Sequence, residues 1–147
     1  MTTFRLLTAA DAAMLERVDG DVFDNAVRPD LVERYLVHPD NLLAVAIEND
    51  EVVGMATGIV YVHPDKPPQL FVNEVGVATR CHRQGIATAL VKLLLERARA
   101  LGCTEAWVAT EEDNAAARAL YRSMRGREDA TRAVVYTWSL ADANAAP

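Results

Sequence analysis

One stretch of the sequence, residues 73–90, constrains the fold more than any other. Residues from Phe71 to Val77, which overlap the start of this stretch, are mostly β-branched or aromatic and predict a strand. Arg80 to Gln84 cannot continue that pattern, and Gly85 allows the backbone to approach another group closely. From Ile86 to about Leu101 apolar residues recur at helical spacing. The stretch therefore predicts a strand, a tight basic turn and the start of a helix.

The basic turn has two interpretations. The start of a helix presents unpaired backbone N–H groups and the positive end of a dipole, which together bind anions. Arg80, His82 and Arg83 lie beside it, so the turn suits a phosphorylated ligand. An ordinary connection between a strand and a helix also contains glycine and basic residues. The spacing alone favours neither interpretation.

Length and composition predict one domain, residues 1–147. The chain is 51% hydrophobic and 24% charged, as in soluble globular proteins. No apolar run approaches the roughly 20 residues of a membrane span, and the chain does not open like a signal peptide. Two cysteines, Cys81 and Cys103, form neither a disulfide framework nor a metal-ligand spacing. We expect a cytoplasmic protein without a metal.

The net charge and the cysteines indicate which partners and which catalytic groups the sequence favours. The net charge of −6 argues against nucleic acid as the main partner and is compatible with a cationic one, although solubility alone explains it more simply. Cys81 lies between Arg80 and His82, which would favour a thiolate. Because no partner base can be identified for it, we do not expect a cysteine nucleophile.

The other elements follow from periodicity and turn residues. We predict further strands at residues 4–7, 42–47, 52–61, 103–110 and 134–140. We predict further helices at 8–18, 30–37 and 115–124, and a frayed tail at 141–147. This order predicts an α/β fold: a mixed, mostly antiparallel sheet with a parallel β-α-β core, flanked by helices. Trp107 and Trp138 are expected to be core aromatics.

Glu74 is an unusual residue for an apolar central strand. Burial of a carboxylate is costly, and a buried carboxylate is a stronger proton acceptor, so Glu74 is a candidate general base. Alternatively, it lies at a bulge and points to solvent. Asn114 begins the last helix and is most simply an N-cap. Tyr121, two turns later, is either a general acid or a half-buried packing residue.

Three motifs occur in a fixed order: Val75-Gly-Val77, His82-Arg-Gln-Gly85-Ile-Ala87 and Asn114-x-x-Ala117-x-x-Leu120-Tyr121. Each is weak alone. In this order and at this separation they resemble the GCN5-related N-acetyltransferase (GNAT) family over nearly the whole chain. Within it, residues 73–95 and the hairpin at 51–54 look most like aminoglycoside 3-N-acetyltransferases.

The resemblance implies acetyl-coenzyme A as the donor. Its pyrophosphate would be held by the turn, and its pantetheine arm would pair with the strand as an added strand does. The implied cofactor-binding residues are Val75, Val77, His82, Arg83, Gln84, Gly85, Ile86, Ala87, Thr88, Asn114 and Ala117. Glu74 would be the general base for the acceptor amine, and Tyr121 would protonate the leaving thiolate.

Two positions depart from the family pattern. His82 stands where the family usually has Arg or Gln, so we expect weaker or pH-sensitive pyrophosphate binding. Gly126 is followed by Arg127 instead of Phe, which changes the expected packing of the last helix.

For the acceptor, the resemblance points to carboxylates in two loops: Asp19, Asp21, Asp24, Glu111, Glu112 and Asp113. They would bind a small cationic amine, with an aminoglycoside first, although solvated loop charge explains any one of them more simply. Alternatives are acetylation of a protein N-terminus or lysine, and a non-catalytic module that senses acetyl-coenzyme A. A homodimer is also expected, with residues 134–138 as a contact unless core burial accounts for them.

Overall fold

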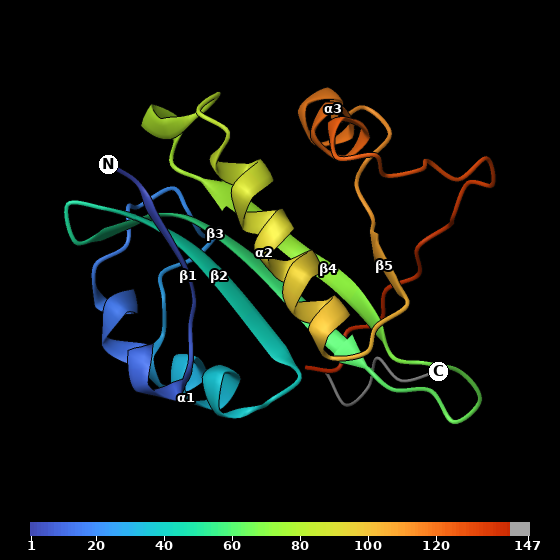
Figure 1. Cartoon of the computed structure of the whole chain (residues 1–147), viewed down its shortest axis with the longest axis horizontal. Helices are drawn as coiled ribbons and strands as arrows, with labels where there is room; N and C mark the ends of the chain where they lie inside the picture. Colours follow the sequence, from blue (N-terminus) through green and yellow to red (C-terminus); the bar gives the residue numbers. More distant parts are fainter. Residues whose placement is uncertain (142–147) are drawn as a thin grey trace.

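The computed structural model describes residues 1–141. In this part of the chain five strands form one sheet in the order β1-β2-β3-β4-β5 (Figure 1). Strands β1 to β4 are antiparallel neighbours, and β4 and β5 are parallel. The strands are β1 (Thr3–Leu6), β2 (Asn41–Glu48), β3 (Glu51–Tyr61), β4 (Gln69–Val77) and β5 (Glu105–Val108). The predicted mixed α/β fold with a parallel β-α-β core is confirmed.

The helices differ from the prediction mainly at the start of the chain. They are η1 (Ala9–Glu16), α1 (Pro29–Val37), η2 (Thr79–Cys81), α2 (Ile86–Ala100) and α3 (Ala115–Ser123). The three α-helices agree with the predicted ones to within one residue at each end. Gly102, just beyond α2, has a φ of +87°, a conformation that suits the glycine expected to end this helix.

The predicted helix at 8–18 is wrong in type and in length. Residues 9–16 form a 3-10 helix, whose three-residue pattern starts with a hydrogen bond from the Asp11 N–H to the Thr8 carbonyl at 2.9 Å. The helix ends at Glu16 because the chain then joins the sheet. Val18 forms a parallel bridge with Val52, and the Asp19 N–H donates to the Val52 carbonyl at 2.9 Å.

Helix α2 packs closely on one face of the sheet, in front of β3 and β4 in Figure 1. Two glycines of β3 make this approach possible. A Cβ at Gly54 would lie 3.0 Å from Ile86 Cγ2 of α2, and one at Gly58 would lie 3.5 Å from Leu94 Cδ1 of α2 and 2.8 Å from Leu70 Cδ1 of β4. The buried face of α2 thus lies directly against a strand that has no side chain at these positions, as its two glycines suggest.

The loop that follows η1 crosses the opposite face of the sheet. A Cβ at Gly76 would lie 2.1 Å from the Val22 carbonyl oxygen, so only glycine allows the loop to lie this close to β4. Side chains alternate along a strand. Glu74 therefore points to the same face as Gly76, toward the loop and away from α2.

The C-terminal part of the prediction is wrong. Strand β5 ends at Val108, and residues 134–140 form no strand in the described chain. A strand needs a neighbour to hydrogen-bond, and this segment pairs with none in residues 1–141. Trp107 and Trp138, expected in the core, are 44% and 63% exposed. The predicted tail lies, except for residue 141, outside the described residues.

We predict that Gly76→Ala destabilises the fold by about 1–3 kcal/mol, since the new methyl group would clash with a backbone carbonyl. Chemical denaturation measures the change. Gly20→Ala is the matched control, because a Cβ there meets nothing within 4 Å, and it should stay within about 0.5 kcal/mol of the parent. Equal stability of the two variants would contradict the close packing of the loop on β4.

Candidate active site

The C-terminal half of β4 has one unpaired edge. β4 pairs with β5 only over Gln69–Val72, because β5 stops at Val108. Beyond this point β4 pairs with β3 alone among the described residues. Val75 and Val77, predicted to bind the donor, lie in this stretch and are partly exposed. An extended ligand can therefore add to β4 here as a strand does.

A β-bulge marks the point where this edge begins. Thr57 lies opposite Glu74 and Gly58 opposite Val72, so Asn73 is the extra residue. The Glu74 N–H donates to Thr57 Oγ1 at 3.1 Å, which uses the buried hydroxyl of Thr57 to hold the bulge. Sequence reasoning overlooked Thr57. A polar residue in an apolar strand was the signal available for it.

Glu74 is exposed, not buried. Its predicted burial in the strand is wrong, and the alternative interpretation, a carboxylate at a bulge that faces solvent, describes it correctly. The side chain is thus accessible to an acceptor on the face of the sheet where the loop after η1 lies. Burial raises the pKa of Tyr35 to about 12, and the negative charge of the nearby Glu74 adds to this increase.

The turn before α2 presents a row of unused donors. No hydrogen bond from the backbone N–H groups of residues 83 to 88 occurs within residues 1–141; the first donor in α2 with an acceptor is Ala89, which bonds to the Gly85 carbonyl at 3.1 Å. Arg83 and Gly85 have φ angles of +61° and +78°, which turn the chain sharply into the helix. Successive N–H groups at a helix start form an anion site. These residues therefore fit a pyrophosphate.

The side chains of the turn contribute less than expected. Arg80 faces away from the donor row: it bonds to Asp19 and to Glu51, both at 2.8 Å. The hydrogen bond to Asp19 raises the pKa of Arg80. His82 places Nε2 2.8 Å from the Val77 carbonyl, which ties the turn to the end of β4. Arg83 has no ion pair among the described residues and remains available to a phosphate.

Cys81 is a packing residue. It is buried, and desolvation raises the pKa of its thiol above the usual value. The neighbouring Arg80 does lower this pKa, as expected, but burial outweighs it, and the Glu48 carboxylate, 3.8 Å from the sulfur, raises the pKa further.

Two of the predicted acceptor carboxylates hold the loop in place. Asp19 is paired with Arg80, as above. Asp21 accepts a hydrogen bond from the Thr79 N–H at 3.0 Å and another from the Thr79 hydroxyl, so it caps η2. These bonds lower the pKa of Asp21. Asp24 is exposed, and its side chain forms no hydrogen bond or ion pair within residues 1–141. The loop after η1 is thus fastened to the turn that carries the donor row.

The other predicted carboxylates lie before α3. Glu111, Glu112 and Asp113 are exposed. Glu112 pairs with Arg132 at 3.0 Å, and its backbone carbonyl accepts from Arg118 at 2.7 Å.

Helix α3 places the two remaining predicted residues. Asn114 is the N-cap: its Oδ1 accepts from the Ala117 N–H at 3.0 Å, as its simplest interpretation requires. Tyr121 is partly buried, and this desolvation raises its pKa. A raised pKa keeps the phenol protonated at neutral pH, so Tyr121 is able to donate a proton.

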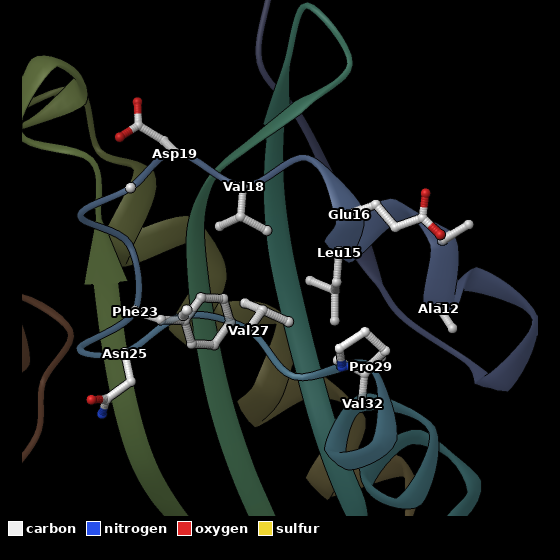
Figure 2. Close-up of a pocket in the computed structure, with 13 residues that line it drawn as sticks. Ala12, Leu15, Glu16, Val18, Asp19, Phe23, Asn25, Val27, Pro29 and Val32 are labelled. Atoms are coloured by element: carbon white, nitrogen blue, oxygen red, sulfur yellow. The ribbon is translucent and has the colours of Figure 1, made fainter.

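A pocket of about 640 Å³ lies between η1, the following loop and α1 (Figure 2). Phe23 and Val27 point into it from the loop, beside Leu15 and Val32, while Asn25 and Asp19 lie at its rim. Sequence reasoning treated residues 19–28 as a loop that carries acceptor carboxylates and predicted no cavity there. The apolar Phe23 and Val27 between polar residues were the signal available for it.

No group of three or more His, Cys, Asp or Glu side chains within residues 1–141 is arranged to bind a metal ion. In the same part of the chain, every helix is too short or too polar to span a bilayer.

The family model for the acetyltransferase (GNAT) family matches residues 10–126. The chain belongs to this family. It is 32% identical to the N-alpha-acetyltransferase RimI of Mycobacterium tuberculosis over 143 residues, which are 96% of this chain and 88% of the relative. It is 34% identical to the L-2,4-diaminobutyric acid acetyltransferase of Nocardia farcinica over 82 residues, 54% of this chain and 42% of that protein. The match thus spans less than half of this relative.

Solved structures share the GNAT fold. An aminoglycoside acetyltransferase from an uncultured soil sample, in complex with sisomicin, superposes with a TM-score of 0.78 at 20% identity, over 94% of this chain and 97% of that one. The aminoglycoside N-acetyltransferase AAC(6')-Iy in complex with coenzyme A superposes with a TM-score of 0.74 at 16% identity, over 93% and 94% of the two chains. At these identities the likeness concerns the fold.

We predict that Asp21→Asn weakens the pH dependence of stability. The folded pKa of Asp21 is lowered, so its stabilisation is complete above the unfolded pKa of 3.8 and is lost as the pH falls below it. Denaturation curves between pH 5 and pH 3 should show a smaller loss in the variant than in the parent. Asp24→Asn is the control and should follow the parent. A variant slope equal to that of the parent would contradict the role of Asp21 as a cap.

Proposed function

We propose that this chain transfers the acetyl group of acetyl-coenzyme A to a primary amine. The observation that carries the proposal is the continuity of the unpaired edge of β4 with the N–H row of residues 83–88. The two are joined through η2 and the hydrogen bond between His82 and Val77. An extended pantetheine would lie along Val75 and Val77, and the pyrophosphate would lie on the N–H row.

The acetyl transfer needs three protein contributions. A backbone N–H near Val75 would polarise the thioester carbonyl. Glu74, exposed on the loop side of the sheet, would accept the proton of the acceptor ammonium, directly or through water. The free amine would then attack the carbonyl carbon, and the C–S bond would break. Tyr121 would give its proton to the departing thiolate. No covalent enzyme intermediate is needed.

The acceptor we propose first is a small polycation, an aminoglycoside acetylated at its 3-amino group. The resemblance of residues 73–95 and 51–54 to aminoglycoside 3-N-acetyltransferases supports it, as does the surplus of carboxylates around the site. Asp24, Glu111 and Asp113 have no ion pair within the described residues, so they would bind the cation. Asp19, Asp21 and Glu112 are already engaged and would position the loops.

A second acceptor is the α-amino group of a peptide. The relative matched over nearly the whole of this chain is an N-alpha-acetyltransferase, which is the observation in its favour. A panel of amines, followed by release of the coenzyme A thiol, separates the two. Turnover of aminoglycosides and not of peptides is the expected result. Turnover confined to peptides would replace the first acceptor by the second, and binding of coenzyme A without turnover of any amine would indicate a sensor.

We predict that Thr88→Glu lowers the affinity for coenzyme A at least about tenfold. A carboxylate in the first turn of α2 would repel the pyrophosphate. The fold should remain intact, because the helix dipole stabilises a negative side chain at this end of the helix. Lys92→Gln changes the net charge by the same amount on an exposed position of the same helix and is the control. Calorimetric titration measures both. Unchanged affinity in Thr88→Glu would place the pyrophosphate elsewhere.

We predict that Glu74→Gln and Tyr121→Phe each lower kcat about 100-fold at neutral pH, as loss of a general base or acid does. The loss in Glu74→Gln should shrink as the pH rises and the amine deprotonates unaided. Glu96→Gln, an exposed change on α2, should leave kcat unaltered. Parent-like pH profiles in both site variants would refute the two roles but not donor binding.

A further inference from the structure

Three aromatic side chains on neighbouring strands form a group that we call the aromatic platform: Tyr61 of β3, Phe71 of β4 and Trp107 of β5 (Figure 1 shows the strands). The rings of Phe71 and Trp107 lie 4.4 Å apart, and the Trp107 indole N–H donates to the Tyr61 hydroxyl at 2.6 Å. Trp107 is 44% exposed, and the other two are partly exposed. Residues 1–141 thus leave much of the platform open to solvent.

The platform lies on the same face of the sheet as Glu74. Gly58 faces α2, because a Cβ there would lie 3.5 Å from a side chain of that helix. Side chains alternate along a strand, so Thr57 and Ile59 of β3 face the other way. Thr57 lies opposite Glu74, and Ile59 lies opposite Phe71. The platform therefore begins about 7 Å from Glu74, measured along β3.

Hydrogen bonds hold the platform in place and satisfy its polar groups. The Tyr61 hydroxyl accepts from Trp107 and donates to Gln69 Oε1 at 2.8 Å, and the Gln69 amide donates to Glu105 at 3.1 Å. An indole has no second polar atom, so the exposed part of the Trp107 side chain is ring carbon. A surface fixed in this way loses little conformational entropy when a ligand binds. The platform is thus suited to C–H groups or a cation placed against its rings.

Two exposed carboxylates lie at opposite ends of the platform. Glu105 pairs with Gln69, which lies opposite Tyr61, whereas Glu74 lies opposite Thr57. The two ends are therefore four residues apart along β3, or about 13 Å. Among the strand residues that lie between these ends on this face of β3, β4 and β5, none is basic. A ligand that spans the platform meets a negative charge at each end and ring surface between them.

We propose that the aromatic platform binds a second ring of the acceptor while Glu74 receives the amine of the first ring. The acceptor class that fits is a chain of linked amino-sugar rings. Each such ring has apolar C–H faces that stack on aromatic rings, and ammonium groups at its edge that bind carboxylates. A peptide offers only one obligatory cation, its α-amino group, and no obligatory ring, so it would leave the platform and Glu105 unused.

This inference rests on the proposed function for the role of Glu74 in the reaction, but binding to the platform is measurable without turnover. The indole N–H of Trp107 gives a separate NMR signal, which is identified by its loss in Trp107→Phe. Sisomicin, an aminoglycoside of several linked rings, should shift this signal in the chain with and without coenzyme A. 2-Deoxystreptamine, a single ring that carries the same 3-amino group, should shift it much less.

Calorimetric titration with sisomicin tests the contribution of the rings. Trp107→Ala should raise the dissociation constant about tenfold, as loss of one ring-stacking or cation–π contact does, and Trp107→Phe should raise it less because a ring face remains. Phe4→Ala is the matched control: Phe4 is 40% exposed and lies on β1, at the other edge of the sheet. It should leave the dissociation constant unchanged. Circular dichroism checks the fold of each variant.

Kinetics separate the platform from the proposed function. Trp107→Ala should raise KM for sisomicin and leave kcat and the KM for acetyl-coenzyme A unchanged. Sisomicin that binds at the platform without turnover would support the platform and contradict the proposed function. Turnover with a KM that Trp107→Ala leaves unchanged would support the function and overturn the platform. An indole signal that sisomicin does not shift, or that a peptide amine shifts as far, would overturn the platform as well.

Discussion

Strand β4 has two neighbours along its first half and one along its second, and the rest of the site depends on this difference. β5 ends at Val108, while the extra residue Asn73 shifts the register of β4 against β3. Beyond these points the strand keeps its pairing with β3 but offers its other edge to a ligand. The same edge leads directly into the turn whose N–H groups lack acceptors.

The packing on the two faces of the sheet keeps this edge accessible. On one face, α2 lies on Gly54 and Gly58, so its first turn starts close to the end of β4. On the other face, the loop after η1 lies on Gly76 and is fastened by the bonds of Asp19 and Asp21 to the turn. The carboxylates of this loop thus stabilise the framework around the donor site. Asp19 and Asp21, which the sequence suggested for binding a ligand, therefore make contacts within the fold instead.

The sequence predicted well what depends on local pattern. The strand-turn-helix at residues 71–101, the cap at Asn114 and the glycine at the end of α2 follow from periodicity and backbone preference, and the structure has each of them. The family assignment rested on these same local motifs. The end of η1 at Glu16 was missed because the chain then joins the sheet through the bridge of Val18 to Val52, a contact between residues far apart in the chain.

Exposure was predicted less well, because it depends on what covers each element. For Glu74 the sequence left burial and a bulge that faces solvent as alternatives, and the structure has the bulge. Trp107 and Trp138 were expected in a core, yet the described chain provides no layer over them. The ion pair between Arg80 and Asp19 was also not predicted, because 61 residues separate the two partners in sequence. Such pairings arise only when the sheet is assembled.

The most direct test of the central claim is an amide NMR titration of the chain with coenzyme A. If the unpaired edge of β4 and the turn bind the donor, the amide resonances of residues 83–88 and of Val75 and Val77 should shift most, and those of β1 and β2 should stay in place. Binding that leaves residues 83–88 unshifted, or that shifts chiefly residues around the pocket behind η1, would contradict the account.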